Sequence, residues 1–177
     1  MGVGLYFINS FYAKILGINK SEFLVHYTSK VQTARNVKIS KGEGSQKAYI
    51  SFATSGGCYY QGLNGIEIGT NTLWAHGCKF ISTNHSFKNY SEPTEAEPIR
   101  IGSNVWLGAN VVVLPGIQIG DNSVVGAGAI VTKNVLNNAI VGGNPAKLLA
   151  MRCRSCGDKI SLHEYTKEFE ECRLCLI

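Results

Sequence analysis

Length, composition and charge indicate a packed globular protein with turn-rich structure. The chain has 177 residues, 45% hydrophobic and 16% charged, with 20 glycines and only 4 prolines; this balance excludes an intrinsically disordered or proline-rich low-complexity chain. The net charge of +5 lies in residues 1–47, which hold seven basic and two acidic side chains. These basic residues are too sparse for a nucleic-acid-binding stripe. They are typical of a solvated face, or of a face that meets an anionic ligand or a membrane.

Residues 1–24 predict an N-terminal amphipathic helix. Apolar side chains recur there every three or four residues, at Val3, Tyr6, Phe7, Phe11, Ile15 and Ile18. No run reaches the roughly 18 apolar residues of a spanning helix, and the pattern of a cleaved signal peptide is missing. We therefore expect a cytoplasmic protein. The apolar face either packs on the main domain, the simpler interpretation, or makes a peripheral contact at the inner face of the membrane.

A six-residue repeat dominates the second half of the chain. Period six fits neither a helix nor plain strand alternation, and Gly, Asn or Asp between the apolar pairs predict a corner after each short strand. Six consecutive repeats predict a β-solenoid, with weaker repeats at Ile68, Trp74 and Phe80. The aliphatic positions are Ile101, Leu107, Val113, Ile119, Val125 and Val131, and the fifth places are held by Val105, Val111, Ile117, Ser123, Ala129 and Val135.

The repeat stops after Phe80 and resumes near Ile99, and the interruption carries a histidine. "TNH", ending at His85, is followed by the polar segment "SFKNYSEPTEAEP", which predicts a loop over residues 84–98. Imidazole accepts a proton near neutral pH, so a histidine at the base of a loop on a rigid scaffold is a candidate general base. Glu92, Glu95 and Glu97 lie in the same loop; Glu97 is our first choice to orient His85, and solvated carboxylates are the alternative.

Residues 151–177 have a different character. Cys153, Cys156, Cys172 and Cys175 form a C-x2-C-x15-C-x2-C pattern, the spacing of a zinc site with four thiolate ligands. A segment this short cannot hold together by its own core. We predict a zinc-ribbon-like module with structural zinc rather than disulfides, because the cytoplasm keeps thiols reduced. The remaining cysteines, Cys58 and Cys78, fit small buried apolar positions.

Two segments give the chain a family resemblance. "IGSNVWLGANVVVLPGIQIGDNSVVGAGAIVTKNV" and the closing "IVGGNPAKLL" resemble the hexapeptide-repeat acyltransferases, most closely the galactoside and maltose O-acetyltransferases and their relatives in surface-polysaccharide pathways. The resemblance implies an all-β fold, a left-handed parallel β-helix over residues 25–150 from which the 84–98 loop is extruded. It is good from Ile66 to Leu148, weaker from Val25 to Gly65, and does not extend past Met151.

The same resemblance implies an activity and assigns site residues. It implies transfer of an acetyl group from acetyl-CoA to a sugar hydroxyl, with His85 as general base and the Ala109 backbone N–H as oxyanion donor. Trp106 matches the residue that lines the thioester end of the CoA channel, with packing between subunits as its alternative role. Further CoA contacts are implied for the Ala127 backbone and, near the phosphates, for Thr132, Lys133 and Lys147.

The resemblance also implies partners and leaves alternatives open. It implies a homotrimer whose active sites lie between subunits, acting on a bacterial surface polysaccharide or its precursor. The family's sugar-contacting Asn corresponds to Ser55 here, which indicates a different acceptor site. The alternatives are an N-acetyltransferase acting on a nucleotide-linked amino sugar and a non-catalytic scaffold whose zinc module binds a protein.

Overall fold

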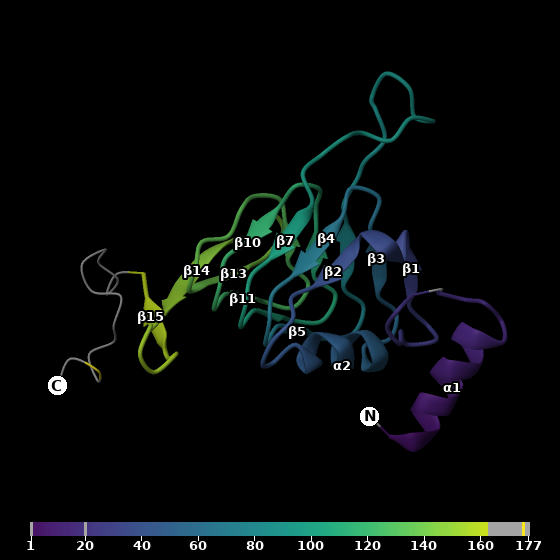
Figure 1. Ribbon diagram of the computed structural model, residues 1–177. Helices are drawn as coiled ribbons and strands as arrows, with labels where there is room; N and C mark the ends of the chain where they lie inside the picture. The colour runs from purple at the N-terminus through teal and green to yellow at the C-terminus, as the bar shows by residue number, and fades with distance from the viewer. Residues whose placement is uncertain (1, 20, 163–174, 176–177) are drawn as a thin grey trace.

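A parallel β-helix forms the body of the protein (Figure 1). The computed structural model describes residues 2–19, 21–162 and 175. Strands of each coil join three sheets in turn, called here sheets A, B and C, and neighbouring coils pair in parallel. This arrangement is consistent with the left-handed β-helix expected from the sequence.

The strands are short, as a six-residue repeat requires. Sheet A contains β1 (Lys30–Gln32), β3 (Tyr59–Gln61), β6 (Lys79–Ile81), β9 (Val112–Val113) and β12 (Ile130–Val131). Sheet B contains β2 (Val37–Ile39), β4 (Ile66–Ile68), β7 (Ile99–Ile101) and β10 (Gln118–Ile119). Sheet C contains β5 (Leu73–Trp74), β8 (Trp106–Leu107), β11 (Val124–Val125), β13 (Ala139–Gly142), β14 (Lys147–Arg152) and β15 (Lys159–Ser161).

The repeated positions form the core, as predicted. All twelve of the aliphatic and fifth-place residues named above are buried, and the hydroxyl of the one polar member, Ser123, donates to Gly120 O at 2.6 Å. Corners between strands use left-handed backbone: Asn104, Asn110 and Asn122 have φ values of 57°, 59° and 58°, which asparagine tolerates better than most residues. The repeat thus encodes both the core and the corners.

A helix replaces one strand of the solenoid, which the sequence did not predict. The 3-10 turn of Ala34–Asn36 comes directly before β2, and α2 (Gln46–Thr54) follows β2. α2 packs beside β5 at the edge of sheet C, where the preceding coil would otherwise add a strand. Its Phe52 is fully buried, with ring centroids 4.6 Å from Tyr60 and 4.8 Å from Trp74. The aromatic cluster covers the open end of the core.

The N-terminal helix forms, but the expected packing of its apolar face is wrong. α1 (Val3–Lys14) stands away from the body at one end of the solenoid (Figure 1). Phe7 and Ile15 are 65% and 70% exposed, and the other apolar positions named above are exposed too. A polar residue anchors the helix instead: buried Asn9 donates to Ala53 O and accepts from the Tyr27 N–H, both at 2.9 Å.

Antiparallel strands end the solenoid at its other end. β13 pairs with β14, and β14 with β15, both antiparallel. This hairpin extends sheet C and carries the first cysteines of the C-terminal module. Within the described ranges, no helix has the length and apolarity needed to cross a membrane.

Candidate active site

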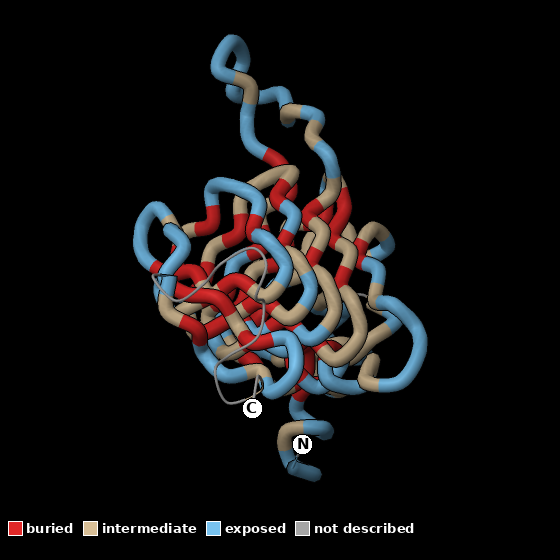
Figure 2. The backbone as a smooth tube through the Cα atoms, turned by 90° about the vertical axis from the view of Figure 1, so that its left-hand side faces the viewer, coloured by how far each residue is buried: buried red, intermediate tan, exposed pale blue. Residues whose placement is uncertain are grey.

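His85 lies just beyond a clamped neck at the base of the extruded loop. The buried Thr83 donates its hydroxyl to Thr94 O at 2.6 Å, and Asn64 donates its side-chain amide to the same carbonyl at 2.9 Å. The Thr94 N–H donates to Asn84 O at 2.8 Å. These bonds fasten the two arms together one residue before His85, which pairs with Pro93 across the loop. Figure 2 shows the loop projecting from the body, largely exposed.

The imidazole of His85 is open to the surroundings. It is exposed, and among the residues that the structure describes neither ring nitrogen has a hydrogen-bond partner. Two of the three loop carboxylates are engaged elsewhere. Glu92 accepts from the Asn89 amide at 2.8 Å, and Glu97 accepts from Arg100 at 3.1 Å. Arg100 also binds Glu67 at 3.2 Å. Our first choice to orient His85, Glu97, thus holds a guanidinium, and its expected role stays a prediction.

Three of the residues predicted to contact CoA, Trp106, Ala109 and Ala127, lie along a different corner, between sheets C and A. Trp106 is on the outer face of β8 and 52% exposed, with Leu73 beside it on β5 and Val124 on β11. Ala109 lies in the turn after β8, and Ala127 lies in the equivalent turn one coil later. A flat aromatic surface and two backbone turns therefore line one edge of the solenoid.

Both turns carry backbone N–H groups that are available to a ligand. In the described part of the chain, the N–H groups of Ala109 and Ala127 have no protein acceptor, although the Gly108 and Gly128 N–H groups beside them bond to Val125 O and Ala109 O at 2.8 and 2.7 Å. The coils approach closely here: a Cβ on Gly108 would lie 2.5 Å from the Ala127 nitrogen. Glycine at 108 thus permits the stacking that aligns the two N–H groups.

The three predicted phosphate contacts are exposed at the C-terminal end of the solenoid. Thr132 and Lys133 follow β12, and Lys147 begins β14. The segment before Lys147 is joined to β12, because Ala146 N–H donates to Ile130 O at 2.8 Å. Lysine side chains at such a place can pair with phosphate oxygens.

A single chain does not bring the base and the oxyanion donor together. His85 leaves the corner between sheets A and B after β6, whereas Ala109 and Trp106 lie at the corner between sheets C and A, before β9. β6 and β9 are neighbours in sheet A, so the width of that sheet separates the two groups. The geometry offers two half-sites at opposite edges of one face.

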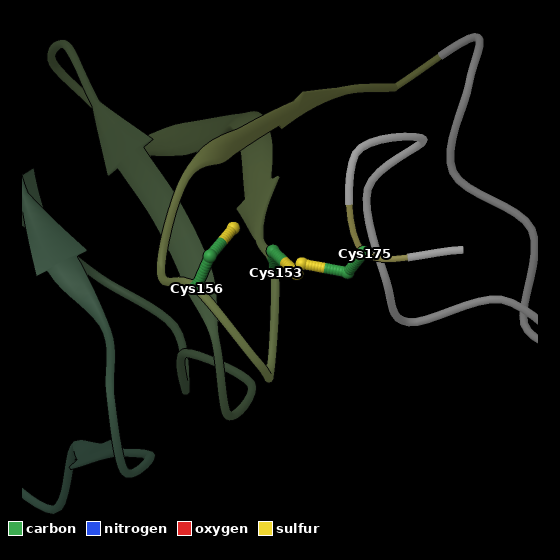
Figure 3. A group of neighbouring side chains, drawn as sticks. All are labelled: Cys153, Cys156 and Cys175. Atoms are coloured by element: carbon green, nitrogen blue, oxygen red, sulfur yellow. Dashed lines mark hydrogen bonds between the residues drawn. The ribbon is translucent and has the colours of Figure 1, made fainter. Parts of the chain in front are cut away.

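The C-terminal cysteines cluster as a metal site would require. The sulfur atoms of Cys153, Cys156 and Cys175 lie within 4.8 Å of one another, and Cys153 Sγ is 3.7 Å from Cys175 Sγ (Figure 3). Two thiolates bound tetrahedrally to one zinc ion lie about 3.8 Å apart, given Zn–S bonds of about 2.3 Å. Gly157, at φ 78°, closes the turn after Cys156. The donor set fits zinc; Cys172 lies outside the described residues.

The remaining cysteines and polar candidates serve the core. Cys58 and Cys78 are buried, as predicted. Burial, together with the neighbouring Cys58, raises the pKa of Cys78 to about 12, so this thiol is not a nucleophile at neutral pH. Ser55 is also buried and donates to Trp74 O at 2.8 Å. Tyr60 lies within the aromatic cluster, and its hydroxyl accepts from the Trp74 indole at 2.7 Å.

Comparison with known proteins confirms the resemblance to hexapeptide-repeat acyltransferases. A family model described as the hexapeptide repeat of succinyl-transferase matches residues 98–133. The galactoside O-acetyltransferase of Escherichia coli K12 is 37% identical over 108 residues, 59% of this chain and 51% of that protein. The curated relatives are therefore matched over only about half their length.

Solved structures agree with the fold. A maltose O-acetyltransferase from Clostridium difficile 630 is 36% identical with a TM-score of 0.51, over 53% of this chain and 52% of that one. A hexapeptide-repeat acetyltransferase from Vibrio cholerae, complexed with acetyl coenzyme A, is 25% identical with a TM-score of 0.51, over 70% of this chain and 67% of that one. The predicted parallel β-helix and its hexapeptide repeat are thereby confirmed.

Proposed function

We propose that the protein is an acetyl-CoA-dependent O-acetyltransferase that modifies a sugar hydroxyl of a bacterial surface polysaccharide or its precursor. One observation carries the proposal. In the described part of the chain, the imidazole on the extruded loop and two backbone N–H groups beside an exposed tryptophan have no protein hydrogen-bond partner, and all lie on the same repeat scaffold. The similar proteins named as galactoside and maltose O-acetyltransferases support the sugar acceptor.

The proposed mechanism is direct transfer, without a covalent enzyme intermediate. His85 accepts the proton of the acceptor hydroxyl as its oxygen attacks the thioester carbonyl carbon. The Ala109 N–H stabilises the oxyanion of the tetrahedral intermediate. The C–S bond then breaks, the carbonyl re-forms, and the imidazolium of His85 returns its proton to the departing CoA sulfur. Glu97→Gln tests whether that carboxylate orients His85 despite its contact with Arg100.

CoA lies along the corner between sheets C and A in this proposal. Trp106 covers the thioester end with its ring, and the Ala127 N–H binds an amide of the pantetheine arm. Thr132, Lys133 and Lys147 meet the phosphates, where ammonium groups pair with anionic oxygens. The cofactor therefore runs from the last coil towards β8.

The separation of the half-sites supports a homotrimer with sites shared between subunits. His85 of one subunit and Ala109 with Trp106 of the next would face the same thioester, because one chain places them at opposite edges of sheet A. Closed cyclic symmetry lets every copy use both of its edges.

Two further features have structural roles in the proposal. Zinc held by Cys153, Cys156 and Cys175, with Cys172 as the expected fourth ligand, would fasten the C-terminal module to β14; zinc with four thiolates holds chain segments and leaves no position for catalysis. At the other end, the exposed apolar face of α1, next to Lys14 and the exposed Arg35 and Lys38, suits contact with an anionic membrane surface on the cytoplasmic side.

Release of the CoA thiol from acetyl-CoA tests the proposal. The parent protein should release thiol in the presence of galactosides, maltose or surface polysaccharides, and a folded His85→Ala variant should lose at least about 100-fold in rate, the general-base contribution. The Asn84→Ala variant at the adjacent loop position serves as control. Transfer to amino sugars alone would favour the N-acetyltransferase alternative, and binding of CoA without any transfer would favour the scaffold.

A further inference from the structure

One corner of the solenoid repeats the same backbone position in four successive coils. Gly77 N–H donates to Gly56 O, Asn110 N–H to His76 O, and Gly128 N–H to Ala109 O, at 2.9, 2.9 and 2.7 Å. These equivalent bonds place Gly56, His76, Ala109 and Ala127 in one column along the corner between sheets C and A. His76 therefore lies one coil before the proposed oxyanion donor, about 4.8 Å along the solenoid.

The environment of His76 fixes its tautomer. The Gly56 N–H donates to His76 Nδ1 at 2.9 Å, so Nδ1 acts as an acceptor and carries no proton. In the neutral ring the proton is then on Nε2. His76 is exposed, so this Nε2–H can donate to a ligand. In this tautomer the ring cannot accept a proton at Nε2 from a substrate, which leaves the role of base to His85.

A second histidine is arranged in the same way beside the column. The Thr28 N–H donates to His26 Nδ1 at 3.2 Å, and the Thr28 hydroxyl lies 2.8 Å from the same atom. The His26 ring packs against Gly56, where an added Cβ would lie 2.9 Å from Cε1. Burial, and then the nearby His76, lower the pKa of His26, which keeps the ring neutral with its proton on Nε2.

The direction in which CoA extends along the column determines which part of the reaction His76 and His26 face. In the proposed function, on which this inference rests, CoA extends from Lys133 past Ala127 to a thioester at Ala109. The next coil along the column lies beyond the acyl group, on the side from which the acceptor must approach. That coil carries His76, with His26 behind it.

We infer that His76, supported by His26, forms an acceptor subsite whose neutral Nε2–H groups donate hydrogen bonds to hydroxyl oxygens of a sugar. His76 is a positioning residue for the hydroxyl that reacts at His85. Two fixed donors match the lone pairs of hydroxyl oxygens. They repel an ammonium group, which carries only donors. The subsite thus selects a hydroxyl acceptor over a protonated amino sugar.

Steady-state kinetics of His76→Phe and His76→Gln test the inference. Phenylalanine keeps a ring without a donor, and glutamine retains an N–H donor. For a galactoside such as methyl β-galactoside, His76→Phe should raise the acceptor KM about tenfold, the effect of one lost hydrogen bond. The KM for acetyl-CoA should not change, and His76→Gln should recover part of the loss. Asn36→Ala, on the 3-10 turn away from the column, is the matched control.

A readout without turnover tests the tautomer directly. Imidazole nitrogen chemical shifts, assigned to His76 by comparison with His76→Gln, should show Nε2 protonated in the free protein and shifted when the galactoside is added to the CoA complex. An unchanged acceptor KM in His76→Phe, or a proton on Nδ1, would overturn the inference while the proposed function stands. If the parent protein transfers acetyl to no sugar, the inference falls with the proposed function.

Discussion

The two tryptophans of the chain should have opposite roles, which makes them a paired test of the CoA site. Trp74 and Trp106 occupy neighbouring strands of sheet C but point to opposite faces. Trp74 is 3% exposed, donates its indole N–H to Tyr60, and lies edge-on to Phe80 at 5.7 Å. Trp106 is 52% exposed. The buried Trp74 should therefore stabilise the fold, and the exposed Trp106 should bind a ligand.

The magnitudes follow from the exposed fractions. Trp74→Ala removes a filled core position and should cost about 3–5 kcal/mol of unfolding free energy. Trp106→Ala should cost no more than about 1 kcal/mol. If CoA covers the exposed half of the Trp106 side chain, about 125 Å² of about 250 Å², its loss removes at most about 3 kcal/mol of binding at about 25 cal/mol per Å². That limit corresponds to about 100-fold in Kd.

Thermal denaturation and calorimetric titration with CoA measure the two effects. Trp106→Ala should bind CoA 10- to 100-fold more weakly, by about the amounts given above, with a nearly parental melting temperature. Indole emission should respond to CoA in the parent protein and not in Trp106→Phe. A Trp106→Ala variant with parental CoA affinity that dissociates into monomers would assign the residue to packing between subunits and refute the reasoning.

Three other predictions concern the metal, the pH dependence and the loop. Native mass spectrometry should find one zinc ion per chain, lost in Cys156→Ser and retained in Cys78→Ala; an intact Cys156→Ser zinc complex would contradict the assigned ligands. Folding holds the pKa of His26 below its usual value near 6.5. The neutral His26 ring therefore contributes its full stabilisation of the fold above that pH, and the contribution declines as the pH falls below it. His26→Gln should reduce the loss of melting temperature between pH 7 and 5, and equal losses in the parent and the variant would refute this. If Glu97 orients His85, Glu97→Gln should lower kcat severalfold and Glu95→Gln should not, whereas equal rates would leave Glu97 only its contact with Arg100.

The solenoid was predictable from the sequence because every six-residue repeat specifies both a buried core position and a corner position. Ile101 and Leu107 are buried as expected, and Asn104 takes the left-handed backbone between them. Neither a helix nor a plain alternating strand buries every sixth residue together with the residue at the fifth place of each repeat. The interruption at His85 was equally visible, since a polar segment cannot continue that core.

The non-repetitive parts were less predictable for physical reasons. The Ser45 side chain at the N-cap of α2 makes no capping hydrogen bond, and the buried residues of the helix are fixed by tertiary contacts of Phe52. The anchoring of α1 depends on one buried amide, Asn9, in a helix whose apolar residues suggested the opposite orientation. The fixed tautomer of His76 depends on a backbone N–H twenty residues away. A single sequence carries no local signal for such pairings.

Mixing two inactive variants tests most directly whether the active site is shared between subunits. At an acetyl-CoA concentration well below the weakened Kd of Trp106→Ala, that variant and His85→Ala are each expected to be nearly inactive. The two would be co-refolded in equal amounts, with each variant refolded alone as control. If one site takes its histidine from one subunit and its tryptophan from the next, random assembly of equal amounts makes about one quarter of all sites fully parental, and acetyl transfer returns to about that fraction of the parental level. Mixed trimers that form but show no more activity than either variant alone would contradict the shared site.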